Sequence, residues 1–462
     1  MAQSSPSHSS QMGRVRVRAS TGENPTHGAR GGGHSAGRRL RSVDVEAAAQ
    51  GPGTFSAQGR VNREPHRGGS NQGGVGAMAR ILFFTFDGGG NHPPTIGIAT
   101  ELKQRGHAVT VAGYESQRRR FEEAGLSFVT LPRSGSFVQP VGVSEMEMRM
   151  ALARGVIANP DHLVEVPELA KGHDAMVVDS GLHMALAAAA ALAQPSAVLF
   201  HTAAAFFKPS PFTAPFLAAI NATRQAHDIA PLTGLLDLTE PIQVIVATLP
   251  ELDDYNLQAP ANWHWVGPIP GPAKESLDEA LFDGSDHRPL VLVGLTTHTA
   301  YGPQTDRLQR ILDALSQLPV RVVATAGVAV DMAAVRVPAN AVVRDYLPHR
   351  ALMPEAAVCV THLGHGTLTE ALLQGVPLVC LPNPMSDQIY LAQRVTTLGA
   401  GVQIDQDSAP ATIREAVQTV LSTSSYREAA VALKTRIGKG GAGRAADVLE
   451  AMLPVKVVPA RR

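Results

Sequence analysis

The sequence has few cysteines, little charge and no long apolar run, and each shortage excludes a class of protein. Its 462 residues include only Cys359 and Cys380, which are too few for a disulfide framework, and no Cys/His cluster has zinc-finger spacing. Forty basic residues balance 40 acidic ones, which excludes a strongly basic nucleic-acid binder for the chain as a whole. The apolar stretch 184–193 is much shorter than a membrane span of about 20 residues. We therefore expect a soluble, cytoplasmic protein that binds neither nucleic acid nor membrane.

Residues 1–77 differ in composition from the rest of the chain. They contain 15 Gly, ten Arg, no Lys and four acidic residues, with few large apolar side chains. Such a segment cannot bury enough surface to offset its conformational entropy, so we predict that 1–77 is a disordered extension. Apolar stretches typical of a folded protein begin abruptly at Met78, which we interpret as the natural start of the protein. A basic tail that contacts a partner is the alternative.

From Met78 onward, apolar strands alternate with amphipathic helices. A strand at 80–86, a glycine turn, a helix that contains Pro94 and a strand at 108–112 form a βαβ unit. Further strands are predicted in both halves of the chain, at 175–179, 196–201, 242–248, 290–293, 320–325, 341–344, 357–361 and 378–381. A Pro- and Gly-rich connection separates the two halves, which predicts an α/β protein with two doubly wound domains and a ligand cleft between them. The predicted boundaries are 78–270 for the first domain, 271–288 for a linker, 289–453 for the second domain and 454–462 for a tail.

One glycine motif near the end of the chain is interpreted as a turn. Residues 438–443 fit GxGxxG, but they follow a helix-like stretch rather than a strand, as a dinucleotide site would require. We predict that this segment is the turn before a last helix at 444–452.

The second domain contains a pattern that is typical of an anion site. A strand ends at Thr361, and a Gly-rich turn leads into a helix that is predicted to start near Thr367. Thr367 and Glu370 match a capping box. The exposed backbone N–H groups and the dipole of such a helix favour phosphate, and His362 adds a donor. His362 and His365 have no evident third partner for a metal, so no metal site is expected.

The stretch 358–402 resembles the nucleotide-sugar signature of family 1, GT-B-fold glycosyltransferases, especially the bacterial macrolide and natural-product branch. The resemblance extends over residues 78 to about 453. It implies a GT-B fold, in which two Rossmann-like domains bind the acceptor and the donor, respectively. It also implies a UDP- or dTDP-sugar as co-substrate, with no metal and no other cofactor. The donor-binding residues implied by the resemblance are Thr297, Tyr346, His362, Gly364, Gly366, Thr367, Glu370, Asp387 and Gln388.

The resemblance assigns roles to these residues. The glycine turn and its helix would hold the donor pyrophosphate, Glu370 the ribose, and Asp387 and Gln388 the sugar hydroxyls. Tyr346 would lie beside the nucleobase and Thr297 would supply a hydroxyl, whereas a glycine at 294 replaces the usual serine. Two of these residues have an alternative explanation that needs no ligand: a capping box accounts for Glu370, and ordinary packing accounts for Tyr346.

The first domain departs from the family pattern, Gly-His-x-x-Pro, in which the histidine is the general base. Pro94 fixes the register, so the histidine position falls on Asn91, and His92 follows one residue later. Adjacent side chains on a helix diverge by about 100°, so the role does not pass automatically to His92. Three hypotheses remain: His92 reaches the acceptor, a carboxylate of Asp87 or Asp179 replaces it, or the acceptor is as acidic as a phenol. Asp179 matches the family position that orients the catalytic histidine.

Apolar residues of the first domain suggest the acceptor. Methionines cluster at 146, 148 and 150, and phenylalanines cluster between 206 and 216. We predict that an adaptable wall lines the site of a small apolar acceptor, with ordinary core packing as the alternative. The predicted acceptor-lining residues are Met146, Met150, Phe206, Phe207 and Phe212.

The reaction that the resemblance implies is inverting, metal-independent transfer of a sugar to an acceptor hydroxyl. Two alternatives are a catalytically degenerate nucleotide-sugar-binding partner protein and a GT-B-fold UDP-sugar epimerase.

Overall fold

The structure is a computed structural model, and it describes most of the chain beyond residue 77. The described ranges are 78–140, 143–237, 242–271, 286–295, 302–383, 387–438 and 440–454. The predicted extension 1–77, most of the predicted linker and nearly all of the predicted tail lie outside the described residues, as does Thr297.

The first half of the described chain folds around a seven-stranded parallel sheet with the order β3-β2-β1-β4-β5-β6-β7. Its strands are β1 (Arg80–Phe84), β2 (Ala108–Gly113), β3 (Ser127–Thr130), β4 (Ala175–Asp179), β5 (Ser196–Phe200), β6 (Gln243–Val246) and β7 (Trp263–Trp265). The helices between them are α1 (His92–Gln104), α2 (Arg118–Glu123), α3 (Glu145–Leu152), α4 (His162–Ala170), α5 (His183–Ala191) and α6 (Ala214–Ala226). All five side chains of β4 and of β5 are buried, because helices cover both faces of a parallel sheet.

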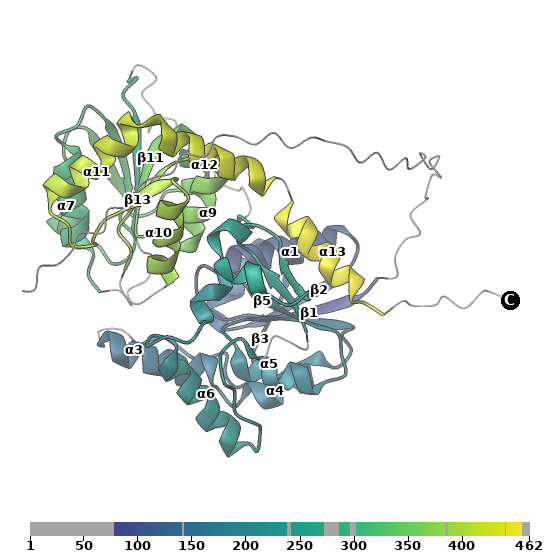
Figure 1. The fold of residues 1–462 in the computed structure, drawn as a ribbon. Coiled ribbons are helices and arrows are strands. Elements are labelled where there is room, and N and C mark those ends of the chain that lie inside the picture. Colours follow the sequence, from purple (N-terminus) through teal and green to yellow (C-terminus); the bar gives the residue numbers. More distant parts are fainter. Residues whose placement is uncertain are drawn as a thin grey trace, which may run out of the picture. The chain divides into compact units, whose positions relative to one another are not determined.

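The second half repeats this architecture around a six-stranded parallel sheet with the order β10-β9-β8-β11-β12-β13 (Figure 1). Its strands are β8 (Leu290–Gly294), β9 (Arg321–Thr325), β10 (Ala341–Arg344), β11 (Ala356–Thr361), β12 (Leu378–Cys380) and β13 (Gly401–Gln403). The helices are α7 (Thr305–Leu315), α8 (His349–Leu352), α9 (His365–Gln374), α10 (Asp387–Thr397), α11 (Pro410–Ser422) and α12 (Ser424–Ile437). The two doubly wound units that the sequence predicts are therefore confirmed.

Each face of each sheet has its own hydrophobic core. In the first sheet, α1 and α2 pack on one face and α4 and α5 on the other. In the second sheet, α7 and α11 cover one face, and α9, α10 and α12 cover the other. No helix within the described ranges is long and apolar enough to cross a membrane.

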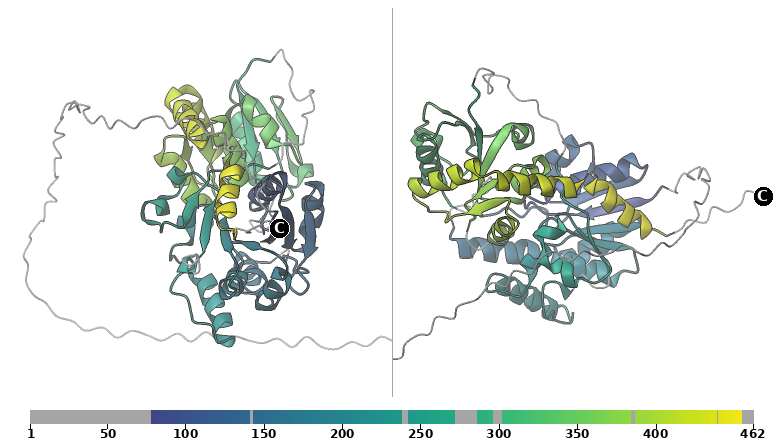
Figure 2. Two further views of the ribbon diagram at one scale, coloured as in Figure 1. Left: turned by 90° about the vertical axis from the view of Figure 1, so that its right-hand side faces the viewer. Right: turned by 45° about the horizontal axis from the view of Figure 1, so that its top comes forward.

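The last helix, α13 (Gly441–Ala451), departs from the predicted domain boundary. The sequence places it in the second domain, but it packs against α1 on the first sheet, with Ala445 and Leu449 in that core. Arg105 of α1 forms ion pairs with Asp447 at 2.6 Å and with Glu450 at 2.8 Å. Figure 2 shows α12 and α13, in yellow-green and yellow, as consecutive helical segments that lead from the second sheet to the first.

The GxGxxG segment is the turn that makes this return possible. Gly438 and Gly440 have φ values of 61° and 96°, in the region that favours glycine. A Cβ atom on Gly441 would lie 2.9 Å from the carbonyl oxygen of Pro268, so the close approach of α13 also requires a glycine there. The predicted turn is confirmed at Gly438 and Gly440, whereas residues 441–443 already belong to α13, which begins three residues earlier than the predicted helix.

Replacement of Leu449 by alanine tests the packing of α13. Leu449 is only 1% exposed, so the Leu449→Ala variant is expected to lose about 2–5 kcal/mol in the free energy of unfolding, measured by urea denaturation. Val448→Ala, at a half-buried position of the same helix, is the matched control and should cost distinctly less. Equal, small losses in both variants would show that α13 does not contribute to this core.

Candidate active site

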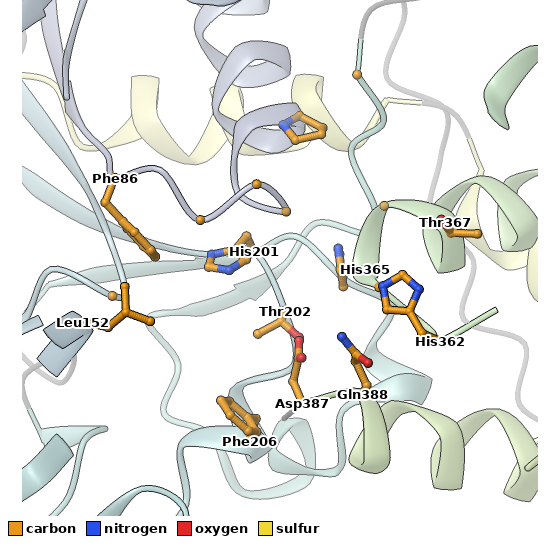
Figure 3. Close-up of a pocket in the computed structure, with 18 of the residues that line it drawn as sticks. Phe86, Leu152, His201, Thr202, Phe206, His362, His365, Thr367, Asp387 and Gln388 are labelled. Carbon is orange, nitrogen blue, oxygen red and sulfur yellow. The ribbon is translucent and has the colours of Figure 1, made fainter. Parts of the chain in front are cut away.

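A cavity of about 840 Å³ lies where the loops after several strands meet. Its wall includes Gly88 to Gly90 after β1, His201 and Thr202 after β5, Tyr346 after β10, and Gly364 after β11. Such loops follow the carboxyl ends of parallel strands, where α/β folds place their ligands. Figure 3 shows the labelled side chains of both halves of the chain around this cavity.

The N-terminus of α9 opens into the cavity without a side-chain cap. The helix begins at His365 with Gly364 as N-cap, and in the described structure no side chain caps it. The predicted Thr367–Glu370 capping box is therefore wrong. Because the helix starts two residues earlier, Thr367 lies inside the first turn, where its Oγ1 is 3.2 Å from Nδ1 of His349. The free N–H groups of this turn leave a partial positive charge at the cavity wall.

The glycine corner before α9 is tightly built. A Cβ atom on Gly364 would lie 2.7 Å from Nε2 of His362, so only glycine lets the chain pass so close to this imidazole. Leu363 has a φ of 68°, a left-handed conformation that is strained for leucine. Its side chain is completely buried in the core beneath α9, and this burial offsets the strain. The backbone at the helix N-terminus is consequently held in place from below.

His349 is a cavity residue that sequence reasoning did not single out. Its Nε2 lies 2.9 Å from Oγ1 of Thr325, and burial lowers its pKa to about 4, so the imidazole is neutral. A Cβ atom on Gly294 would lie 2.4 Å from Cε1 of His349. The ring therefore fills the space of the side chain that the resemblance expects at position 294. The sequence contained a signal for this residue, because His349 ends the same Asp-Tyr-Leu-Pro-His segment as Tyr346.

Glu370 presents a carboxylate to the cavity from the second turn of α9. Burial raises the pKa of Glu370 to about 7, although the guanidinium of Arg350 works in the opposite direction. Its Oε2 is buried and has no hydrogen-bond partner within the described residues. A buried acceptor of this kind is costly unless a ligand supplies the donor.

The start of α10 places two polar residues beside the end of β5. Asp387 accepts a hydrogen bond of 2.7 Å from the hydroxyl of Thr202, a residue 185 positions earlier in the chain. Burial raises the pKa of Asp387, while the hydroxyl of Thr202 and the ring of His201 oppose that shift. Gln388 accepts hydrogen bonds of 3.0 Å from the backbone N–H and the side-chain amide of Asn383. In Figure 3 the side chains of Thr202 and Asp387 point toward one another, next to Gln388.

Of the nine predicted donor-binding residues, all but Thr297 are described, and each described one lines the cavity. They are Tyr346, His362, Gly364, Gly366, Thr367, Glu370, Asp387 and Gln388. Tyr346 is 64% exposed, so its side chain is not packed in a core.

The opposite wall of the cavity is apolar and aromatic. The predicted residues Phe206, Phe207 and Phe212 line it, and the ring centroids of Phe206 and Phe212 are 5.0 Å apart. The predicted Met146 and Met150 are not among the lining residues, whereas Met148 is. Because these residues lie on α3, positions two apart diverge by about 200°, so Met148 faces inward and Met146 is 56% exposed. Arg149, over the ring of Phe212 at 4.6 Å, adds a charge that the sequence analysis missed.

The predicted catalytic residues near α1 do not line the cavity in the described structure. His92 is 3% exposed, and its ring packs edge-on against Phe121, with centroids 5.9 Å apart. Burial lowers the pKa of His92 to about 4, although Asp87 works in the opposite direction. Asp87 accepts a hydrogen bond of 2.6 Å from the hydroxyl of Ser116. Because adjacent side chains on a helix point in directions about 100° apart, the side chain of His92 points into the core while that of Asn91 faces Asp179.

Asn91 and Asp179 form a buried polar pair below the cavity. The Nδ2 of Asn91 lies 3.0 Å from Oδ2 of Asp179, 2.8 Å from the carbonyl oxygen of Phe86 and 3.0 Å from Oγ1 of Thr85. Asp179 also accepts a hydrogen bond of 2.9 Å from the backbone N–H of Gly181. Asn91 is thus a donor that holds the Asp179 carboxylate.

His201, directly after β5, meets the same carboxylate from the other side. Its Nδ1 lies 3.6 Å from Oδ2 of Asp179, and the ring lines the cavity. Burial works against protonation, but the charges of Asp179 and Asp387 outweigh it and raise the pKa of His201. The sequence analysis assigned residue 201 to the strand and gave it no role.

Comparisons with known proteins identify similar chains. Residues 309–454 match a family described as "Erythromycin biosynthesis protein CIII-like, C-terminal domain". A "PGL/p-HBAD biosynthesis rhamnosyltransferase" of Mycobacterium bovis (strain BCG / Pasteur 1173P2) is 32% identical over 231 residues, 48% of this chain and 49% of the relative. The chain thus spans about half the length of that relative. A "4'-demethylrebeccamycin synthase" of Lentzea aerocolonigenes is 26% identical over 410 residues, 77% of this chain and 95% of the relative.

Solved structures share the fold. The crystal structure of the glycotransferase of kitacinnamycin matches with a TM-score of 0.68 and 23% sequence identity. The match covers 82% of this chain and all of the other chain. The chain therefore has the overall fold of a solved structure.

The unusual carboxyl group of Glu370 predicts a specific pH dependence of stability. Because its folded-state pKa of about 7 exceeds the ordinary glutamate value of 4.5, the folded protein holds this proton more tightly. The contribution to stability is complete below the unfolded pKa and is lost as the pH rises through the folded one. Glu370→Gln removes this loss, so the variant should gain about 1–3 kcal/mol over wild type between pH 5 and pH 8 in urea denaturation. The exposed Glu415→Gln is the control, and parallel curves for all three proteins would contradict the prediction.

Proposed function

We propose that the chain is a family 1, GT-B-fold glycosyltransferase and that it transfers a sugar from a UDP- or dTDP-sugar to a small apolar natural product. The acceptor group is a hydroxyl, the anomeric configuration is inverted, and no metal takes part. The observation that carries the proposal is the uncapped N-terminus of α9, which opens into a cavity that also holds Glu370, whose Oε2 has no hydrogen-bond partner within the described ranges.

The donor half of the cavity suits a nucleoside diphosphate sugar. Backbone N–H groups at a helix N-terminus bind phosphate, and the glycine corner before α9 lets an oxygen approach them closely. Glu370 supplies the acceptor that the hydroxyls of a ribose require. Tyr346, with its exposed ring, offers a face on which a nucleobase stacks, and Asp387 with Gln388 binds sugar hydroxyls.

The acceptor half suits an apolar molecule. The rings of Phe206, Phe207 and Phe212 pack against one another in the cavity wall, and Met148 lines the same cavity. Aromatic side chains and methionine adapt to flat or irregular apolar ligands at little conformational cost. A cavity of about 840 Å³ is within the usual range for a small-molecule site.

The chemistry follows from these two halves. The acceptor oxygen attacks the anomeric carbon while the bond to the diphosphate breaks, so negative charge grows on the leaving group. The dipole of α9, its N–H groups and His362 stabilise that charge. Asp387 and Gln388 hold the sugar in the orientation that exposes its anomeric carbon to the acceptor.

Purified protein incubated with UDP- and dTDP-sugars and a panel of aglycones tests the proposal. Glycosylated product with inverted anomeric configuration is the expected result, at a rate that an added chelator leaves unchanged. Isomerised donor without transfer would favour an epimerase. Nucleotide binding by calorimetry without turnover would favour a degenerate partner protein, the alternative that Asn91 at the usual base position supports. Absence of affinity for both UDP and dTDP would contradict the proposal that the cavity beside α9 binds the donor.

His362 provides a test of leaving-group stabilisation. If its ring donates to the departing diphosphate, His362→Gln should lower kcat by about 10²–10³-fold, because that interaction strengthens as charge develops. The exposed His227→Gln is a matched control that should keep the wild-type kcat. Steady-state kinetics and a thermal melt of both variants separate a catalytic effect from loss of fold. A wild-type kcat in the folded His362→Gln variant would place the leaving group elsewhere.

A further inference from the structure

The proposed transfer needs a general base, and the usual position cannot supply one. Asn91 takes up no proton near neutral pH, and its amide is engaged by Asp179, Phe86 and Thr85. His92 lies in the core, outside the cavity lining, with a pKa lowered to about 4 by burial. The base must therefore come from another element of the cavity wall.

Five histidines line the cavity within the described residues: His183, His201, His349, His362 and His365. Both ring nitrogens of His349 face threonine hydroxyls, and His362 has its Nδ1 3.3 Å from the carbonyl oxygen of Gly294. Burial lowers the pKa of His183 to about 4, and burial with the nearby His201 lowers that of His365 to about 3. Such weakly basic rings are poor proton acceptors.

His201 differs from these rings because a buried carboxylate lies beside it. Strands β4 and β5 are parallel neighbours with Asp179 in register with Leu199, so His201 comes two residues beyond that pair. This register brings Nδ1 of His201 to 3.6 Å from Oδ2 of Asp179. The Cδ2 edge of the ring lies 3.9 Å from where a Cβ atom of Gly90 would be, on the loop that borders the cavity. Because Nδ1 is the ring nitrogen on the side of this carboxylate, although within the described residues it makes no hydrogen bond there, Nε2 is the nitrogen left for a ligand.

His201 also lies next to the proposed sugar site. Its neighbour Thr202 donates the 2.7 Å hydrogen bond to Asp387, the residue proposed to hold the sugar. The edge of the Phe86 ring meets the imidazole at a centroid distance of 6.4 Å. Figure 3 shows His201 between Phe86 on one side and Thr202 and Asp387 on the other. A base at this point borders both the aromatic acceptor wall and the anomeric carbon of a bound donor.

The geometry points to His201 as the catalytic base of the proposed transfer, with Asp179 and Asn91 as positioning residues; this inference rests on the proposed function. Nε2 of His201 takes the proton of the acceptor hydroxyl while the hydroxyl oxygen forms a bond to the anomeric carbon of the sugar. The bond from that carbon to the diphosphate breaks, and its electron pair leaves with the diphosphate. The proton remains on the imidazolium, which the Asp179 carboxylate stabilises. Asn91 replaces the family histidine and orients the carboxylate from below.

The charged and titratable groups around His201 predict the pH profile. Asp179 at the end of β4 and Asp387 on α10 favour the imidazolium, whereas His92 on α1 and His365 on α9 are neighbouring rings that oppose it when charged. Because the base must be neutral, kcat/KM should rise with pH through a pKa above the ordinary histidine value of about 6.5. Asp179→Asn removes the stabilising charge, so this inflection should move to lower pH while kcat falls.

Kinetics with two acceptors test the assignment. His201→Ala should lower kcat about 10²–10⁴-fold with an aliphatic alcohol and much less with an acidic phenol, which needs little help in losing its proton. Added imidazole should restore part of the rate, which a merely structural histidine would not allow. The affinity for UDP or dTDP, measured by calorimetry, should be unchanged. His201→Gln repeats the comparison if the alanine variant fails to fold.

The controls separate failure of this inference from failure of the proposed function. His227→Ala, at an exposed site, should keep the wild-type rate, and His92→Gln should keep the wild-type pH inflection. If wild type transfers sugar and folded His201→Ala and His201→Gln keep its rate with both acceptors, His201 is not the base. A rate loss in His92→Gln alone would likewise overturn the assignment. Absence of transfer by wild type with every donor would overturn the proposed function, and this inference with it.

Discussion

The buried carboxylate of Asp179 organises the acceptor side of the cavity. A carboxyl group at the end of a fully buried strand is costly unless polar groups surround it. Here three segments approach it: the N–H of Gly181 and the amide of Asn91 as hydrogen-bond donors, and the ring of His201 at 3.6 Å. These contacts fix the relative positions of the loops after β1, β4 and β5. The same constraint turns His92 away, because Asn91 already occupies the place beside the carboxylate.

The donor side depends on close packing around glycine. The His349 ring occupies the space above Gly294, and His362 lies against Gly364, so in each case the missing Cβ atom makes room for an imidazole. His349 in turn bridges Thr325 and Thr367, which ties β9 to the first turn of α9. The N–H groups of that turn are held at a fixed place in the wall before any ligand binds. Preorganised donors of this kind stabilise developing charge without the cost of reorientation.

One hydrogen bond connects these two sides. Thr202 follows the end of β5 and Asp387 begins α10, and their contact joins the segment that carries His201 to the segment proposed to hold the sugar. The proposed base and the proposed sugar site, where the proton is removed and the bond to the diphosphate breaks, are therefore linked by the Thr202–Asp387 hydrogen bond. The return of α13 to the first sheet, with the ion pairs of Arg105, is a second connection between the halves of the chain.

The sequence by itself determined the two α/β units, because the alternation of apolar strands, short glycine turns and amphipathic helices allows few other structures. It also placed the glycine corner between the end of a strand and the start of a helix, where a local pattern of residue types is enough. It did not predict β3, β7 and β13, which are only three or four residues long and carry little pattern. Only the tertiary structure decided which of Asn91 and His92 faces Asp179, and which methionine of α3 faces inward, since helix phase depends on where the helix begins. Likewise, the pairing of His201 with Asp179 depends on the register of two strands, and strand register is set by packing between segments that are distant in the chain.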